Sequence, residues 1–273
     1  MRINTRKLKN FAKSKISNHL LFLTLSNLLN LFRKNKIFFF RNQDLIKVVA
    51  INEKITWNTH KSRMHLYKNG LENRGRSLGK SYLLQHIRFK DGDLVIDCGA
   101  NMGDLQIYFK NIGVNIEYLG IEPNPLDFRC LELNLLPRNK ALNIGLWDQN
   151  KVLDFYIDSE SASSSFIPGP NFTEIILIEA KRLDDFQFEK PIKLLKVEGE
   201  GAEPEILKGV ELLIDKIEYI SVDVGPERGV DQTTTRTPVI DFLLQNKFII
   251  VEENPYHRKT ILFKNISFKL SPA

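Results

Sequence analysis

The sequence predicts an α/β protein built on a mostly parallel β-sheet, preceded by a basic segment. Between residues 90 and 265, short apolar runs alternate with helical patterns, as they do where a parallel sheet is covered on both faces. The final strand-like runs, 247–253 and 259–264, are separated by about five residues, which favours an antiparallel hairpin. Residues 1–43 contain ten Lys and Arg and no acid, whereas the remaining residues carry a net charge of −4.

The expected elements follow in chain order. Residues 54–93 predict short strands, a polar loop at 69–80 and a helix near 80–88. Apolar runs then predict strands at 94–98, 116–121, 141–146, 192–198 and 217–224, with a β-rich excursion at 152–186. Helical patterns predict helices at about 103–111, 125–135, 204–214 and 237–246; Pro204 suits the start of its helix. We therefore expect an N-terminal arm at 1–43 and one domain at 44–273, with its core at 90–265.

Composition bounds the class of protein. A chain of 273 residues with 42% hydrophobic residues can bury one substantial core and still carry an appendage. Cys98 and Cys130 are the only cysteines. Their spacing fits neither a zinc site nor a disulfide scaffold, so a reducing, cytoplasmic compartment is expected.

The arm contains an apolar stretch at 19–32 that is shorter than the roughly 20 residues of a membrane span and is interrupted by polar residues. No small-residue cleavage site follows it, so a signal peptide is not expected. Two interpretations remain open: a helix packed on the domain, or an interfacial helix that brings the protein to the periphery of an anionic membrane. Nucleic-acid binding is not favoured, because the basic pattern does not extend into the acidic body.

The segment "VIDCGANMGDLQIYF" (95–109) joins a strand to a helix through a glycine turn. Its spacing, Gly99-Ala-Asn-Met-Gly103, places Asn101 where the dinucleotide fingerprint has its second glycine, and it lacks the Gly-Lys-Ser/Thr of a P-loop. The turn is therefore not obviously built for phosphate.

A carboxylate follows the next predicted strand, at a sequence separation from the glycine turn that is typical of ribose binding. Glu122 lies 23 residues after Gly99, near the separation at which an acid accepts ribose hydroxyls. Ligands of open parallel sheets bind beyond the carboxyl ends of the strands, where the glycine turn and Glu122 are both expected. These features predict a cofactor that has a ribose but no phosphate, such as S-adenosylmethionine. Asp97 or Asp104 could bind its ammonium group.

Three segments resemble the signatures of the FkbM-family methyltransferases over about residues 80–264: "VIDCGANMG", "GIEPNP" and "LKVEGEGAEPEILKG". The resemblance implies the Rossmann-like class I methyltransferase fold, S-adenosylmethionine as cofactor, and O-methylation. It also implies that the methionine end meets Asp97, Gly99, Asn101 and Gly103, that Glu122 holds the ribose, with Asn124 beside it, and that Asp148 lies near the adenine. Where the family usually has Asp-Val-Glu-Gly-Ala-Glu, this chain has Glu198-Gly199-Glu200-Gly201-Ala202-Glu203.

Methyl transfer to a hydroxyl benefits from a base, for which the candidates are Glu198, Glu200, Asp223 and His257, with His65 further behind. Because alternate residues of a strand face opposite ways, only one of Glu198 and Glu200 is expected in the pocket. Glu203 is expected to cap its helix.

No spacing of His, Asp and Glu indicates a metal. Acceptor recognition is expected from two polar sections, "YKNGLENRGRSLGKS" (67–81) with Arg74 and Arg76, and "GPERGVDQTTTRT" (225–237) with Glu227, Arg228 and Arg236.

The sequence thus favours an O-methyltransferase acting on a saccharide, a glycan-type acceptor or another small molecule. The alternative is a methyltransferase-like binding or scaffold protein that has lost turnover, motivated by the departure at Glu198-Gly199. An RNA methyltransferase is less favoured, because the Asn/Asp-Pro-Pro-aromatic tetrad of many amino-directed enzymes is missing after strand 192–198.

Overall fold

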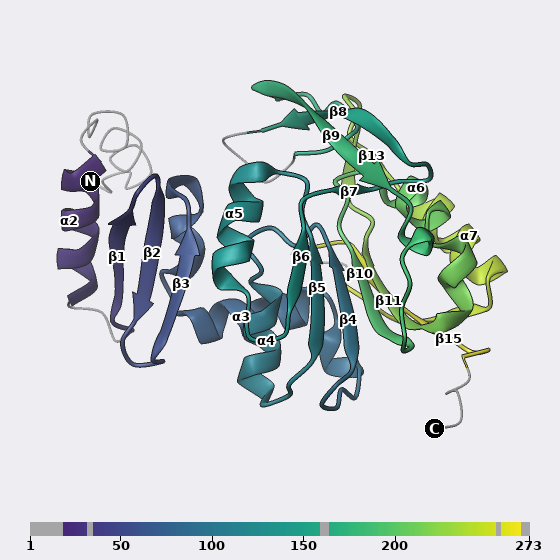
Figure 1. Cartoon of the computed structure of the whole chain (residues 1–273), viewed down its shortest axis with the longest axis horizontal. Helices are drawn as coiled ribbons and strands as arrows, with labels where there is room; N and C mark the ends of the chain where they lie inside the picture. Colours follow the sequence, from purple (N-terminus) through teal and green to yellow (C-terminus); the bar gives the residue numbers. More distant parts are fainter. Residues whose placement is uncertain (1–18, 32–34, 159–163, 255–257, 269–273) are drawn as a thin grey trace, which may run out of the picture. The chain divides into compact units, whose positions relative to one another are not determined.

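The computed structural model describes residues 19–31, 35–158, 164–254 and 258–268. The chain divides into two compact units, Met1–Leu71 and Glu72–Ala273. Figure 1 shows both units with most of their helices and strands labelled. Along the chain, the units meet after Leu71, whereas residue 43, where the sequence predicted the boundary, lies in a hairpin of the first unit.

The first unit combines a helix with a small antiparallel sheet. Helix α2 (His19–Leu31) precedes strands β1 (Ile37–Asn42), β2 (Leu45–Ala50) and β3 (Ile55–Thr59), which pair in that order, and the 3-10 helix η1 (Lys61–Tyr67) follows. Because β1 pairs with β2 along its whole length, the basic arm is not separate from the residues after position 43.

Two of the polar residues that interrupt the apolar stretch explain how α2 packs. The Asn27 side chain accepts a hydrogen bond from the Phe39 N–H and donates one to the Phe39 carbonyl, both at 2.8 Å. Asn30 Nδ2 donates to the Ile37 carbonyl at 2.7 Å. Both asparagines thus satisfy main-chain groups on the open edge of β1, as a helix packed on its own unit requires. Among the described residues, no helix has the length and apolar character needed to cross a bilayer.

The second unit is built on a seven-stranded sheet in the order β14-β15-β11-β10-β4-β5-β6. Its strands are β4 (Leu94–Cys98), β5 (Glu117–Ile121), β6 (Lys140–Leu142), β10 (Ile192–Val197), β11 (Ile217–Asp223), β14 (Phe248–Glu253) and β15 (Thr260–Asn265). Strands β6, β5, β4, β10 and β11 are parallel, and β15 runs antiparallel to both β11 and β14. The Rossmann-like class I fold and its antiparallel C-terminal hairpin are therefore confirmed.

Helices cover both faces of this sheet (Figure 1). Helices α3 (Leu71–Ser81), α4 (Leu105–Ile112) and α5 (Pro125–Asn134) contribute to the buried cluster around Val95, whereas α6 (Glu203–Lys208) and α7 (Arg236–Gln245) contribute to the cluster around Ile96. A separate sheet is formed by β7 (Gly145–Leu146), β9 (Glu174–Lys181) and β8 (Lys151–Ile157), and β12 (Pro226–Arg228) pairs with β13 (Thr233–Thr234).

The polar loop expected at 69–80 is wrong, because most of it forms α3. Its glycines serve close packing: a Cβ at Gly75 would lie 2.8 Å from the Ile107 backbone, and one at Gly79 would lie 2.2 Å from the Tyr108 ring. The helix expected at 80–88 is also wrong. The chain leaves α3 through Leu83 at φ +61°, and only the 3-10 helix η2 (Leu84–His86) follows.

Two other expected elements are shorter than predicted. The strand 141–146 is split into β6 and β7, which belong to different sheets. The helix 204–214 ends at Lys208 and continues as the 3-10 helix η4 (Glu211–Lys216). Gly209 stands at that break, where a Cβ would lie 2.0 Å from the Trp147 carbonyl oxygen.

Candidate functional site

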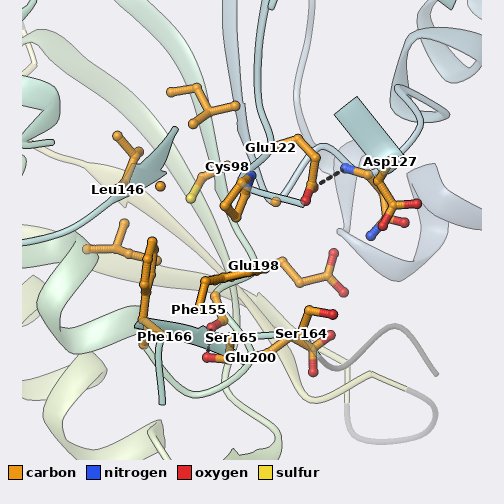
Figure 2. Close-up of a pocket in the computed structure, with 18 residues that line it drawn as sticks. Cys98, Glu122, Asp127, Leu146, Phe155, Ser164, Ser165, Phe166, Glu198 and Glu200 are labelled. Carbon is orange, nitrogen blue, oxygen red and sulfur yellow. Dashed lines mark hydrogen bonds between the residues drawn. The ribbon is translucent and has the colours of Figure 1, made fainter. Parts of the chain in front are cut away.

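A pocket lies at the carboxyl ends of β4, β5 and β10, where the sequence places the ligand. It is partly open to solvent, and many of the residues that line it belong to the turns that follow these strands. Figure 2 shows Leu146 and Phe166 on one side of the pocket and the carboxyl groups of Glu122 and Asp127 on the other. One end is thus apolar and the other acidic.

The glycine turn after β4 brings two strand ends together. Gly99 has φ +74°, and a Cβ there would lie 2.2 Å from the Glu198 carbonyl oxygen, so no other residue fits without a shift. The N–H groups of Gly99 and Ala100 both donate to the Ile121 carbonyl, which ties the turn to the end of β5. Asn101 also takes positive φ, at +52°.

Glu122 connects this turn to the start of α5. Its Oε2 accepts a hydrogen bond from the Asn101 N–H at 2.7 Å, and its Oε1 accepts one from the Asn124 N–H at 2.8 Å. Burial, with the neighbouring Asp127 charge, raises the pKa of Glu122 to about 8. Since each carboxylate oxygen offers two acceptor positions, both oxygens can still accept a ligand hydroxyl.

Five charged side chains of alternating sign form a chain across the ends of the central strands. Lys196 Nζ lies 3.0 Å from both Asp97 Oδ1 and Glu198 Oε2. Arg258 pairs with Glu198 and lies 3.2 Å from Asp223 Oδ2. Lys196 also donates to the Cys98 and Gly99 carbonyls, so this ion chain holds the glycine turn against β10.

The structure brings only part of the predicted site to the pocket. The residues of the prediction that line it are Gly99, Asn101, Glu122, Glu198 and Glu200. Both Glu198 and Glu200 do so, because β10 ends at Val197 and the chain then turns through Glu200 at φ +50°. The expectation that only one of these carboxylates meets the pocket is therefore wrong.

The other predicted residues do not line this pocket: Asp97, Gly103, Asp104, Asn124, Asp148 and Asp223. Asp97 accepts a hydrogen bond from the Tyr118 hydroxyl at 2.7 Å, in addition to its pairing in the ion chain. Asp104 Oδ2 lies 2.7 Å from Arg74 Nε. Asn124 caps α5 by accepting from the Leu126 N–H at 3.0 Å. Their cofactor roles stay predictions.

Glu203 stabilises the turn after β10 from within α6. Its Oε1 accepts hydrogen bonds from the N–H groups of Gly199 and Gly201, at 2.9 and 3.1 Å, and its Oε2 accepts one from Thr235 Oγ1. The buried carboxylate thus reaches back to the turn that carries Glu200, beyond the capping role expected of it.

The apolar end of the pocket was not predicted. Phe155 and Phe166 line it with their rings 5.1 Å apart, and Trp147 packs against Phe166 at 5.6 Å. Next to Trp147, the buried Oδ1 atom of Asp148 has no hydrogen-bond partner among the described residues. Aromatic side chains at this end of the pocket suit a flat ring, whereas the Asp148 oxygen is buried outside the pocket lining.

Sequence reasoning also missed Lys196, Tyr82 and Arg258. A lysine inside the apolar strand "IKLLKV" is a signal that could have indicated a buried ion pair. His257 lies outside the described residues, and His65 belongs to the first unit.

Three of the residues expected to recognise an acceptor, Arg74, Arg228 and Arg236, make ion pairs within the second unit. Arg228 binds Glu205 through two nitrogens, and Arg236 pairs with Glu253. Arg74 pairs with Asp104, as noted above. Within the described ranges, no group of three His, Cys, Asp or Glu side chains is placed to hold a metal ion.

Residues 97–258 match the model of the methyltransferase FkbM domain, more than half of the chain. The chain belongs to the FkbM family of methyltransferases. It is similar to Methyltransferase 1 of Beauveria bassiana (strain ARSEF 2860), with 26% identity over 61% of this chain and 76% of that protein. It is also similar to Methyltransferase sdnD of Sordaria araneosa, with 29% identity over 56% of this chain and 72% of that protein.

Among solved structures, a methyltransferase FkbM from Methylobacillus flagellatus KT matches with a TM-score of 0.46 and 18% identity. The match covers 65% of this chain and 44% of that chain, less than half of its length. Membership of the FkbM family makes this chain a methyltransferase and implies that it uses S-adenosylmethionine.

The raised pKa of Glu122 predicts that cofactor affinity depends on pH. An ionised carboxylate accepts ribose hydroxyls better than a protonated one, so affinity for S-adenosylhomocysteine should rise as pH increases toward about 8. The affinity should rise by at most about tenfold per pH unit below that value and then level off. Calorimetric titration from about pH 6 to 9 measures it. The control is Glu122→Gln, because the amino group of the ligand titrates equally in experiments with the wild-type protein and with this variant. An equal rise with the variant would contradict the role of Glu122.

Proposed function

We propose that the pocket binds S-adenosylmethionine with its adenine at the apolar end and its ribose at Glu122. The opposed characters of the two ends support this orientation: aromatic side chains suit the base, and carboxylates suit a cofactor with a sulfonium and an ammonium group. Gly99 and Asn101 line the acidic end, where the methionine portion would lie.

The acceptor we propose is a hydroxyl group on a saccharide or glycan-type molecule. The observation that carries this proposal is the position of Glu198, which lines the pocket at the end of β10, beside the cofactor turn of β4. In that position it can accept the hydroxyl proton while the oxygen attacks the sulfonium methyl group. Glu200 lines the same region, and its carboxylate can accept hydrogen bonds from further hydroxyl groups of the acceptor.

Methyl transfer from labelled S-adenosylmethionine tests this proposal. The full-length protein is incubated with cell extract separated into glycan, lipid, protein, RNA and small-molecule fractions. We expect label in the glycan or small-molecule fraction, as a methyl ether that resists mild base. Label in RNA or protein would overturn the acceptor class. Tight cofactor binding without transfer to any fraction would favour the scaffold alternative.

We also propose that the first unit brings the protein to an anionic membrane surface inside the cytoplasm. Three leucines of α2 leave about half of their side chains exposed, Leu25 at 42%, Leu28 at 50% and Leu31 at 52%. They follow one another at intervals of three residues, on a helix whose segment carries an excess of positive charge. Both cysteines are free and buried, which suits a reducing compartment.

The membrane proposal predicts a selective loss of vesicle binding. The full-length protein should sediment with vesicles containing phosphatidylglycerol and not with pure phosphatidylcholine vesicles. Leu25→Ser with Leu28→Ser should reduce binding at least severalfold, because less apolar surface enters the interface. Leu212→Ser, at a leucine that is 80% exposed in the second unit, is the control. Equal binding by the double variant would favour a helix that only packs on its own unit.

A further inference from the structure

Glu198 is held by three side chains that do not themselves line the pocket. Its Oε2 accepts a hydrogen bond from the Tyr82 hydroxyl and lies 3.0 Å from Lys196 Nζ. Its Oε1 pairs with Arg258. These partners come from the end of α3, from β10 and from the segment before β15, so Glu198 is oriented from three directions.

Tyr82 is itself firmly placed. Only 2% of it is exposed, and its carbonyl accepts a hydrogen bond from Ser221 Oγ at 2.8 Å. Its ring has Lys196 Nζ at 4.9 Å and Arg258 Cζ at 5.2 Å from the centroid, both within cation–π range. The ring therefore cannot turn freely, and the direction of its hydroxyl toward Glu198 is fixed.

The count of donors distinguishes the two oxygens of Glu198. Among the described residues, Oε2 has two donors, Tyr82 and Lys196, whereas Oε1 has one, Arg258. Since a carboxylate oxygen accepts about two hydrogen bonds, Oε1 keeps the position that an incoming hydroxyl can use. Without the Tyr82 hydroxyl, Oε2 would gain an open position, and the carboxylate could accept the hydroxyl in a second, wrong orientation.

From this arrangement we infer that Tyr82 is a positioning residue for methyl transfer, which directs one oxygen of Glu198 toward the acceptor. The inference rests on the proposed role of Glu198. The charged groups around Glu198 are Lys196 on β10, Arg258 before β15, Asp223 on β11 and Asp97 on β4. None of these charges changes in Tyr82→Phe, which removes only the hydroxyl.

Nuclear magnetic resonance tests the contact without an acceptor. The chain has seven tyrosines, so a protein labelled with 13C at the tyrosine ζ carbon gives few signals, and the Tyr82 signal is the one that Tyr82→Phe removes. Glu198→Gln should shift this signal, because the phenol loses a charged acceptor. Glu218→Gln, which makes the same charge change at the far end of β11, should not. A Tyr82 signal that is unmoved by Glu198→Gln overturns the inference.

Kinetics test the effect of Tyr82 on methyl transfer, with labelled S-adenosylmethionine and the extract fraction that the transfer experiment identifies as the acceptor. Tyr82→Phe should lower kcat about tenfold and leave the KM for S-adenosylmethionine unchanged. The acid limb of its kcat profile should move to higher pH, since a hydrogen bond to the ionised carboxylate is lost. The control is Tyr219→Phe, because Tyr219 also has two cations near its ring, Lys193 and Lys264, but does not line the pocket.

The outcomes separate the two proposals. If the wild-type protein transfers methyl groups and Tyr82→Phe keeps the wild-type kcat and pH profile, the positioning role is overturned and the proposed function stands. If the wild-type protein transfers no methyl group to any fraction, the proposed function fails, and the positioning role fails with it.

Discussion

Glu198→Gln should lower the rate of methyl transfer about 10²–10⁴-fold while leaving the affinity for S-adenosylmethionine nearly unchanged. Glutamine keeps the size of the side chain and one acceptor oxygen but cannot take up the acceptor proton. The fold should survive, because each cation beside Glu198 keeps a second carboxylate: Asp97 for Lys196, and Asp223 for Arg258. Single-turnover transfer and calorimetry measure the two quantities on the same preparation.

The control for this prediction must remove one negative charge at a distance from the pocket. Glu203→Gln is unsuitable, because the Glu203 carboxylate holds the turn after β10 through Gly199 and Gly201. Glu218→Gln is better matched: Glu218 is partly buried and pairs with Lys193 on β10, outside the pocket. If Glu198→Gln kept near wild-type turnover, Glu198 would be structural, and Glu200 and Asp223 would be the next candidates for the base.

The site residues that could be predicted from the sequence are those whose position depends on a short stretch of neighbouring residues, such as a strand and the turn that follows it. The turn after β4 could be predicted because its first residue has positive φ and lies close to another backbone. Only glycine fits such a position, so Gly99 is visible in the sequence. Glu122 could be predicted because a strand and its following turn fix its separation from Gly99. The same local logic located Glu198 and Glu200 but misjudged their orientation, because the end of β10 at Val197 is not visible in the sequence.

The parts that sequence reasoning missed depend on long-range contacts. Tyr82, Lys196 and Arg258 come together only because β10 lies between β4 and β11, and β15 lies beside β11. Nothing local indicates that β15 is inserted between β11 and β14, and this insertion brings Arg258 next to Asp223. Helix α3 was missed for a related reason: its glycines, which suggest a loop, are needed for contact with α4.

Lys196→Met should destabilise the second unit by about 3–5 kcal/mol, the typical cost of removing one partner from a buried ion pair. Only 2% of Lys196 is exposed, and burial of the ammonium is offset by Asp97, which helps to raise the pKa of Lys196. Methionine would leave Asp97 and Glu198 without their shared cation. It would also remove the Lys196 hydrogen bonds to the Cys98 and Gly99 carbonyls, of which the Cys98 carbonyl keeps the Glu198 N–H, so cofactor affinity should fall as well.

Urea unfolding followed by tryptophan fluorescence measures this effect. The chain has two tryptophans, Trp57 in the first unit and Trp147 in the second, so a Trp57→Phe background reports on the second unit alone. Lys193→Met is the matched control on the same strand, since Lys193 makes one partly exposed ion pair with Glu218 and should cost about 1 kcal/mol or less.

A double-variant cycle identifies the physical cause of the loss. If the cost of Lys196→Met arises from carboxylates that lose their shared cation, adding Glu198→Gln should recover part of it, because only Asp97 then remains charged without Lys196. We expect a favourable coupling of about 1 kcal/mol or more between the two substitutions. Additive costs would contradict the ion chain as the origin of the stability and would leave the carbonyl hydrogen bonds of Lys196 as its main contribution. In either case Lys196 joins β10 to the glycine turn after β4, so the stability of the fold and the geometry of the candidate site depend on the same side chain.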